Sequence, residues 1–421
     1  MAARLAGGLR TPHACPVTLL PLPPTDDTTG WVSEHLEHLT RDGVHASGRF
    51  RGGQTAADTA LATLDLTGYA SRRNEVLPVS RRGASGLSPY IRHGLLTLPE
   101  VWAAAAKAPT RDRDKFRDEL LWQEYGRHLY ARLGTRTRTA LRAEPPRPQR
   151  TWNEPWPSDM ACVDNALAEL DADGWMVNQT RMWLASQWTV RAGWDWSAGE
   201  DEMYARLIDG SRAANRLGWQ WTTGVGSGKP YGFSRWQVRK RAPGLCEGCA
   251  LKRACPIEDW PSDQETQWLP GEELLAADPD VATTAGPRAV LRTATPEVVW
   301  LTAESLGTSD PALAANPDLP VVFVLDEPLL TRLRLAGLRL VFLAESLAEL
   351  GEHRELEVHL GRPAEVLAGR VAAVTAAPVP GFRRLAHTLE PAELHPWPWL
   401  RQPGAGPVQS FSAWRRSVGR G

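Results

Sequence analysis

The chain has 421 residues, with 48 basic and 49 acidic side chains. This length allows two or three domains around a sizeable core, and the near-neutral charge excludes nucleic-acid binding through a global positive field. The start lacks a secretory apolar segment, and no stretch is apolar enough to cross a membrane. Five cysteines are too few for a disulfide scaffold, so we expect a cytoplasmic protein. We also expect the protein to be a monomer.

The first 45 residues are rich in Pro and Thr and weakly periodic, which predicts an N-terminal lead-in. Residues 46–260 follow with mostly helical apolar spacing and predict a helical domain. Its clearest helices are expected at 115–133, 162–170 and 175–193, the last ending at Gly193.

Residues 261–290 are acidic and contain Pro, Gly and Thr, as is typical of an interdomain linker. Beyond it, short β-branched runs at 297–301, 319–326 and 356–360 are followed by helical or loop segments, notably 338–354. This alternation predicts a small α/β domain with a parallel sheet over 291–421. The expected fold class is therefore α + α/β, with the helical part first.

The 19 tryptophans outnumber the seven phenylalanines and six tyrosines, which inverts the usual order. One interpretation is a Trp-rich helical core, and the other is a set of redox relays or base-stacking platforms. Composition alone leaves both open.

Three of the five cysteines lie in LCEGCALKRACP, residues 245–256. In a reducing compartment a C-x-x-C pair more often binds metal than forms a disulfide. Three cysteines are one ligand too few for a structural zinc ion or a four-iron cubane, so a fourth ligand must come from elsewhere. The spacing alone does not distinguish zinc from an iron–sulfur cluster.

Five segments together carry a family resemblance: GYASRRN (68–74), SGLSPYIRHG (85–94), ELLWQEYGRHL (119–129), GWMVNQTRM (174–182) and LIDGSRAANRLGWQW (207–221). Through them the region from Phe50 to Trp221 resembles the helical, FAD-binding catalytic domain of the DNA photolyase/cryptochrome family. The resemblance implies FAD as cofactor. It implies phosphate and ribityl contacts from Tyr69, Ser85, Leu87 and Ser88, and flavin-ring contacts from Asn178, Arg181, Asp209 and Asn215, with Ser211 where the family usually has a second acid.

The residues of GWMVNQTRM support a polar site in their own right. Asn178, Arg181 and Met182 lie on one helical face, and Asp209 could form a buried pair with Arg181. Such a pair and nearby amides supply the donors and acceptors that a flavin edge needs. An ordinary salt bridge between helices is the alternative.

The resemblance also implies a pocket for a pyrimidine dimer turned out of the DNA duplex. Glu119 would bond the base edge, Trp122 and Trp221 would stack on it, and Met182 and Asn215 would complete the site. Trp122 and Trp221 as core residues are the alternative. The family's photoreduction chain corresponds to Trp219 and Trp196. Further tryptophans that could continue or replace that chain are Trp152, Trp156, Trp183, Trp188 and Trp194.

One branch of the family, the iron–sulfur bacterial cryptochromes and photolyases, holds a [4Fe–4S] cluster with a DMAC cysteine, a C-x-x-C pair and a CP cysteine. The matching positions here are Cys162, Cys246, Cys249 and Cys255. The resemblance therefore implies a structural cluster, with zinc as the rival. Residues 291–421 resemble the family's antenna domain, which normally comes first, so the chain looks circularly permuted. The antenna chromophore is unknown.

These observations predict an enzyme of the deoxyribodipyrimidine photo-lyase type. Its excited, reduced FAD would repair UV-induced pyrimidine photoproducts in damaged DNA by electron transfer. The alternatives are a cryptochrome-like photoreceptor without repair activity, a non-photochemical DNA-binding iron–sulfur protein, and a zinc-stapled structural protein.

Overall fold

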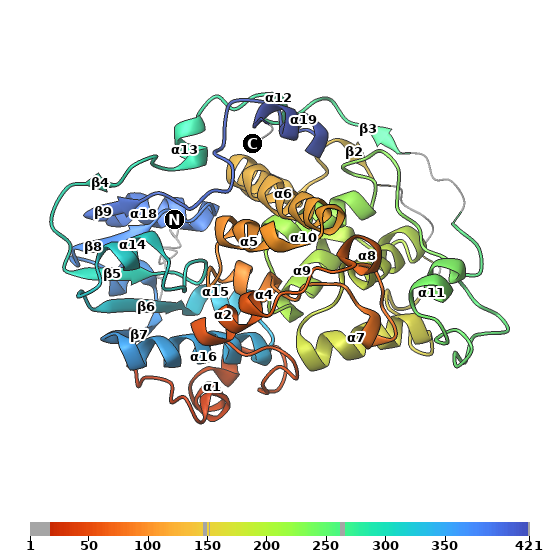
Figure 1. Ribbon diagram of the computed structural model, residues 1–421, viewed down its shortest axis with the longest axis horizontal. Coiled ribbons are helices and arrows are strands. Elements are labelled where there is room, and N and C mark those ends of the chain that lie inside the picture. Colours follow the sequence, from red (N-terminus) through yellow and green to blue (C-terminus); the bar gives the residue numbers. More distant parts are fainter. Residues whose placement is uncertain (1–16, 146–149, 151, 262–265, 420–421) are drawn as a thin grey trace, which may run out of the picture.

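The computed structural model describes residues 17–145, 150, 152–261 and 266–419, which leaves Cys15 outside the described part. Figure 1 shows a β-sheet at one end of the molecule and a body of helices at the other. The helical and α/β parts predicted from the sequence are both present.

Seven strands form the sheet, in the order β1-β7-β6-β5-β8-β9-β4. The five central strands run parallel, and both edge strands are antiparallel to their neighbours. Buried β-branched residues such as Val299 and Val358 fill the middle, as expected for a sheet covered on both faces. The strands are β1 (Thr18–Leu20), β4 (Leu291–Arg292), β5 (Val298–Leu301), β6 (Val321–Asp326), β7 (Leu356–Gly361), β8 (Ala372–Thr375) and β9 (Glu393–His395).

Helix α16 (Gly337–His353) connects the sheet to the helical body. The backbone amides of Gly52 and Gly53 donate to Glu345 and Ser346 of this helix, at 2.6 and 3.0 Å. A Cβ on Gly52 would lie 2.1 Å from the Phe342 carbonyl oxygen, so only glycine permits this approach. The remaining helices of the α/β part are α14 (Pro311–Ala315), α15 (Glu327–Leu333), α17 (Pro363–Val366) and α18 (Pro380–Leu389).

The helical body contains all three helices predicted for it. Helix α8 continues as a short π-helix over Gln187–Arg191, and Gly193 then adopts a φ of 72°. That left-handed conformation favours glycine, so the predicted end of this helix is confirmed. The helices of the body are α2 (Gln54–Ala62), α3 (Tyr69–Arg72), α4 (Ser88–Arg92), α5 (Leu98–Ala104), α6 (Thr110–Leu133), α7 (Ala161–Asp173), α8 (Asn178–Ser186), α9 (Trp196–Arg206), α10 (Arg212–Thr222) and α11 (Arg235–Arg241).

The described part of the N-terminal lead-in, residues 17–45, is built into the α/β part. Strand β1 pairs with β7, and α1 (Thr28–Leu36) packs on α16. A three-residue strand is too short to show a period, so weak periodicity did not reveal it.

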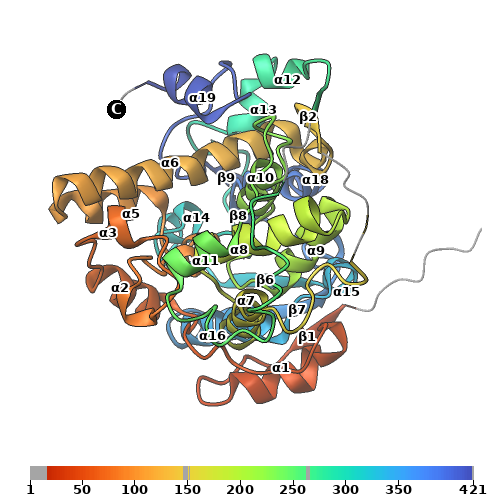
Figure 2. The same cartoon turned by 90° about the vertical axis from the view of Figure 1, so that its right-hand side faces the viewer.

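The segment predicted as a linker lies along α6 (Figure 2). Its strand β3 (Gln267–Trp268) pairs with β2 (Ala143–Glu144). Arg132 Nε of α6 lies 3.2 Å from Asp278 Oδ2, with both side chains 3% exposed. Residues 266–290 are thus fixed to the helical body by a buried ion pair. The helices above α6 are α12 (Glu273–Ala276), α13 (Val281–Ala285) and α19 (Phe411–Ser417).

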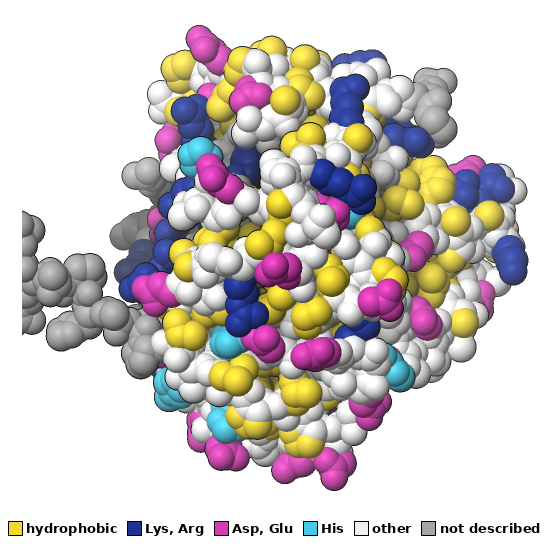
Figure 3. Space-filling view, turned by 90° about the vertical axis from the view of Figure 1, so that its left-hand side faces the viewer, with side chains coloured by type: hydrophobic (Ala, Val, Ile, Leu, Met, Phe, Trp, Pro, Cys, Tyr) yellow, Lys and Arg dark blue, Asp and Glu magenta, His cyan; other side chains and the backbone are white. Residues whose placement is uncertain are grey.

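At the sheet end of the molecule, acidic and basic side chains are interspersed among apolar ones (Figure 3). This mixed face fits the nearly neutral net charge. Within the described residues, every helix is too short or too polar to cross a membrane.

Candidate functional site

Arg181 and Asp209 form a two-pronged ion pair between α8 and the loop before α10. Arg181 Nη1 and Nη2 donate to the two oxygens of Asp209 at 3.0 and 2.8 Å, and Arg181 Nε donates to the Met176 carbonyl. The Asp209 side chain is 3% exposed and that of Arg181 is 22% exposed. The pair expected from the sequence is therefore present, and its planar geometry fixes both groups.

The amides of the predicted flavin site bond to protein groups. Asn178 Nδ2 lies 3.5 Å from Met182 Sδ on the same face of α8. Asn215 Nδ2 donates to the Glu200 carbonyl and carboxylate at 3.1 and 3.0 Å. Ser211 caps α10, its Oγ accepting from the Ala214 amide.

Glu200 is a buried carboxylate that the sequence analysis missed. Its side chain is 1% exposed, and it binds Arg212 at 2.6 Å and Arg216 at 3.3 Å. In the sequence it belongs to the acidic run EDE (200–202), which resembles a solvated helix face. The pairing of Asn215 with this residue could be found only from the fold.

The residues expected near the FAD phosphates lie on α3, α4 and the turn before α4. Ser88 opens α4, and its Oγ accepts from Trp175 Nε1 at 2.9 Å. Leu87 is 1% exposed. The Leu87 amide lies 3.5 Å from Ser85 Oγ. Tyr69 packs edge-on against Phe116, and burial raises the pKa of its phenol.

The two tryptophans expected to stack on a lesion have different surroundings. Trp221 is 41% exposed and lies 5.4 Å from the Tyr231 ring. Trp122 is stacked at 4.0 Å and 11° against Phe411 of α19. One face of Trp122 is therefore covered by the C-terminal segment of the chain.

Glu119 lies on α6 in a cationic setting. Its Oε1 accepts from Arg73 Nε at 3.1 Å and lies 2.8 Å from Lys115 Nζ. With 34% of its side chain exposed, Glu119 still faces solvent. The carboxylate can therefore accept a further hydrogen bond.

Trp219, one of the two predicted electron-transfer residues, lies in a cluster of indoles. Trp219 is 2% exposed, and its ring lies 6.3 Å from Trp188, which in turn lies 4.8 Å from Trp156 and 6.0 Å from Trp194. A Cβ on Gly199 would lie 2.3 Å from Trp219, so this glycine admits the ring against α9. Of the other tryptophans singled out by the sequence, Trp196 is buried where α9 begins, Trp183 is stacked at 6.0 Å on Phe233, and Trp152 is half-buried.

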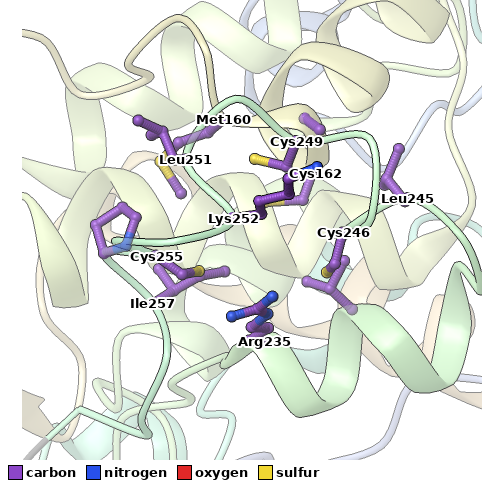
Figure 4. A pocket seen from close by; sticks show the side chains of 13 residues that line it. Met160, Cys162, Arg235, Leu245, Cys246, Cys249, Leu251, Lys252, Cys255 and Ile257 are labelled. Atoms are coloured by element: carbon purple, nitrogen blue, oxygen red, sulfur yellow. The ribbon is translucent and has the colours of Figure 1, made fainter.

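The four cysteines singled out by the sequence line one small cavity, bounded on one side by α7 and on the other by the loop after α11 (Figure 4). All four are free thiols. Burial raises the pKa of the Cys162 thiol to about 12, and the other three cysteines add to the shift. The remaining wall is mainly apolar, with Arg235 and Lys252 as its charged members.

Within the part of the chain that the structure describes, no three His, Cys, Asp or Glu side chains form a group that could hold a metal ion. A zinc ion requires its thiolates to converge on one point, whereas each thiolate of a cubane binds a different iron. Four cysteines around one cavity are a donor set of the kind that binds a structural zinc ion or a four-iron cluster.

Comparison with known proteins finds matches within the helical body. Residues 116–240 match the family model described as the FAD binding domain of DNA photolyase. The deoxyribodipyrimidine photo-lyase of Vibrio cholerae is 32% identical over 36% of this chain and 35% of its own length. That of Synechococcus is 30% identical over 51% and 49%, and the cryptochrome DASH of Idiomarina loihiensis is 29% identical over 62% and 59%.

Two solved structures align with about half of the chain. A Synechocystis cryptochrome is 21% identical and covers 48% of this chain and 46% of its own, with a TM-score of 0.41. A class III photolyase from Agrobacterium tumefaciens is 24% identical and covers 48% and 41%, with a TM-score of 0.35. The chain spans between about a quarter and three fifths of the length of the curated relatives it matches. Over residues 116–240, its helical part is similar to the FAD binding domain of DNA photolyase.

Proposed function

We propose that the protein is a light-dependent flavoprotein that repairs UV-induced pyrimidine photoproducts in DNA. The observation that carries the proposal is the Arg181–Asp209 ion pair, which lies within the region that matches the FAD binding domain. When bound and reduced, FAD supplies the electron that splits a pyrimidine dimer after light absorption. The protein supplies the orientation, the lesion contacts and the exclusion of water.

The Arg181–Asp209 pair orients the flavin in this proposal. A guanidinium and a carboxylate held side by side offer a donor and an acceptor to the edge of the ring. Because each already binds the other, neither must reorganise when the ring arrives. The other contacts proposed for FAD are those of Tyr69, Ser85, Leu87, Ser88, Asn178, Ser211 and Asn215.

Glu119 and Trp221 contact the lesion in this proposal. The carboxylate accepts a hydrogen bond from the base edge, and the open face of Trp221 stacks on the flipped base. Met182 and Trp122 complete the pocket. Trp219 and Trp196 would pass an electron from an external reductant to an oxidised flavin. Trp188 lies beside Trp219, and Trp156 lies beside Trp188.

We further propose that Cys162, Cys246, Cys249 and Cys255 bind a structural [4Fe–4S] cluster. The free thiols around one cavity support this assignment, and structural zinc is the rival. We retain the predicted division into a catalytic domain at 46–260 and a permuted, antenna-like domain at 291–421, in a monomer that acts on damaged DNA.

The test is light-driven turnover by the full chain, purified without oxygen and reduced. We expect FAD to copurify, and blue light to restore normal bases in DNA that contains cyclobutane dimers or (6-4) products. The protein in the dark serves as the control. A flavin-replete protein that repairs neither lesion would overturn the proposal.

A cryptochrome-like photoreceptor is the second candidate, and the stacking of Phe411 on Trp122 favours it. A lesion that needs both faces of Trp122 would have to displace α19. A photoreceptor would photoreduce its FAD under blue light but leave both lesions intact. The same assay therefore separates the two functions.

A further inference from the structure

Arg235 is the first residue of α11 and one of two cations that line the cysteine cavity. Figure 4 shows its guanidinium between Cys246 and Cys255. Its backbone amide donates to the Ile257 carbonyl at 2.7 Å, and its Nη1 donates to Glu258 at 2.6 Å. With the side chain only 15% exposed, the guanidinium is held in place at the cavity wall.

One N–H donor of this guanidinium has no hydrogen-bond acceptor among the described residues. Arg235 Nε is buried and has no hydrogen-bond partner among the described residues. Buried donors in folded proteins nearly always have an acceptor, because an unpaired one loses its hydration without compensation. Since the Arg235 side chain lines the cavity, a ligand bound there could supply the missing acceptor.

We propose that Arg235 Nε–H donates a hydrogen bond to a sulfur of the cluster and raises its reduction potential. This inference rests on the cluster of the proposed function. A cubane with four thiolates is anionic, and gaining one electron makes it more negative. A fixed cation and an N–H donor at a sulfur stabilise the reduced form more than the oxidised one. Arg235 is thus a positioning and tuning residue.

Arg239 provides a matched control on the same helix. It is an exposed arginine one turn further along α11, and it is not among the residues that line the cavity. Replacing either arginine by glutamine removes one positive charge near the cysteine loop. Only the change at 235 also removes the Nε–H donor from the cavity wall.

The experiment uses the full chain purified without oxygen, with iron and sulfide quantified. The one-electron potential of the cluster is measured by titration with dithionite as the electron donor, followed by absorbance and electron paramagnetic resonance. We expect R235Q to lower the potential and R239Q to shift it much less. R235K, which keeps the charge but not the Nε–H, should fall between wild type and R235Q.

Two results would overturn the inference while leaving the cluster standing: an unchanged potential in R235Q, or equal shifts in R235Q and R239Q. If R235Q loses its cluster, R235K carries the test, and a wild-type potential in that variant contradicts the role of Nε–H. Wild-type protein without iron and sulfide would instead refute the cluster itself, and the inference with it.

Discussion

The Arg181–Asp209 pair and the cysteine cavity represent opposite ways of building a site. In the first, both prongs of the guanidinium meet the carboxylate without any ligand. In the second, the four cysteines form no disulfide, and Arg235 Nε has no hydrogen-bond acceptor among the described residues. A site whose polar groups bond to one another keeps its shape without a ligand. A site whose polar groups lack partners depends on its ligand for stability.

The largest effect is expected at the cavity. Cys246→Ala removes one of the four cysteines proposed to bind the cluster, so iron should be lost and the yield of soluble protein should fall sharply. Metal analysis and size-exclusion chromatography measure both, with Cys15→Ala as the control. A soluble, flavin-replete variant that had lost only repair would contradict a structural role.

The Asp209→Asn variant tests the Arg181–Asp209 pair. Neutralising the partner leaves the Arg181 charge uncompensated and should cost roughly 2 to 4 kcal/mol of unfolding free energy, at the lower side because Arg181 keeps some solvent contact. Bound FAD should fall as well. Asp114→Asn, at an exposed pair with Arg113, should cost less than about 1 kcal/mol. Equal losses of unfolding free energy in the two variants would show that the Arg181–Asp209 pair stabilises the protein no more than an exposed pair does.

Glu124 on α6 is an intermediate case, because only one of its two carboxylate oxygens has a hydrogen-bond partner among the described residues. Its Oε1 accepts from the Arg401 amide at 2.9 Å, but its Oε2 is buried without a hydrogen-bond partner among the described residues. Burial outweighs the pull of Arg127 and raises the pKa of Glu124 from 4.5 to about 7. The folded protein therefore keeps a proton there that the unfolded chain releases.

It follows that this carboxyl destabilises the protein as the pH rises from about 4.5 to about 7, with no further loss above that range. Relative to Glu124→Gln, wild type should lose roughly 3 kcal/mol of unfolding free energy across that window. Neighbouring His128, whose pKa burial lowers to about 3, has the opposite trend but is common to both proteins and cancels in the difference. Parallel pH profiles from urea unfolding would refute the assignment.

The smallest effect concerns the cover on Trp122. Phe411→Ala removes the ring that is stacked on Trp122 and should loosen α19. If Trp122 stacks on the lesion, the variant should bind dimer-containing DNA a few-fold more tightly than wild type. Ser412→Ala, at an exposed position of the same helix, serves as the control in a fluorescence-anisotropy titration. Unchanged or weaker binding would assign Trp122 to the core.

Long periodic segments were predictable from the sequence, and short or non-local features were not. Helices α6, α7 and α16 and strands β5 to β7 lie where the apolar spacing placed them. Strands β1, β4 and β9 have two or three residues each, too few for a period of two to register. The four-cysteine cavity followed from a family resemblance, whereas the Asn215–Glu200 bond and the Phe411–Trp122 stack depend on contacts that only the fold brings together.

The pairing of β1 with β7 has a consequence for how the chain is made. Thr18 finds its partner, Leu360, only after most of the protein has been synthesised. Until then the N-terminal strand has nothing to dock on, and the β7 edge stays open once it forms. We therefore expect the sheet to close late and slowly, and nascent chains to associate more readily until β1 has paired with β7.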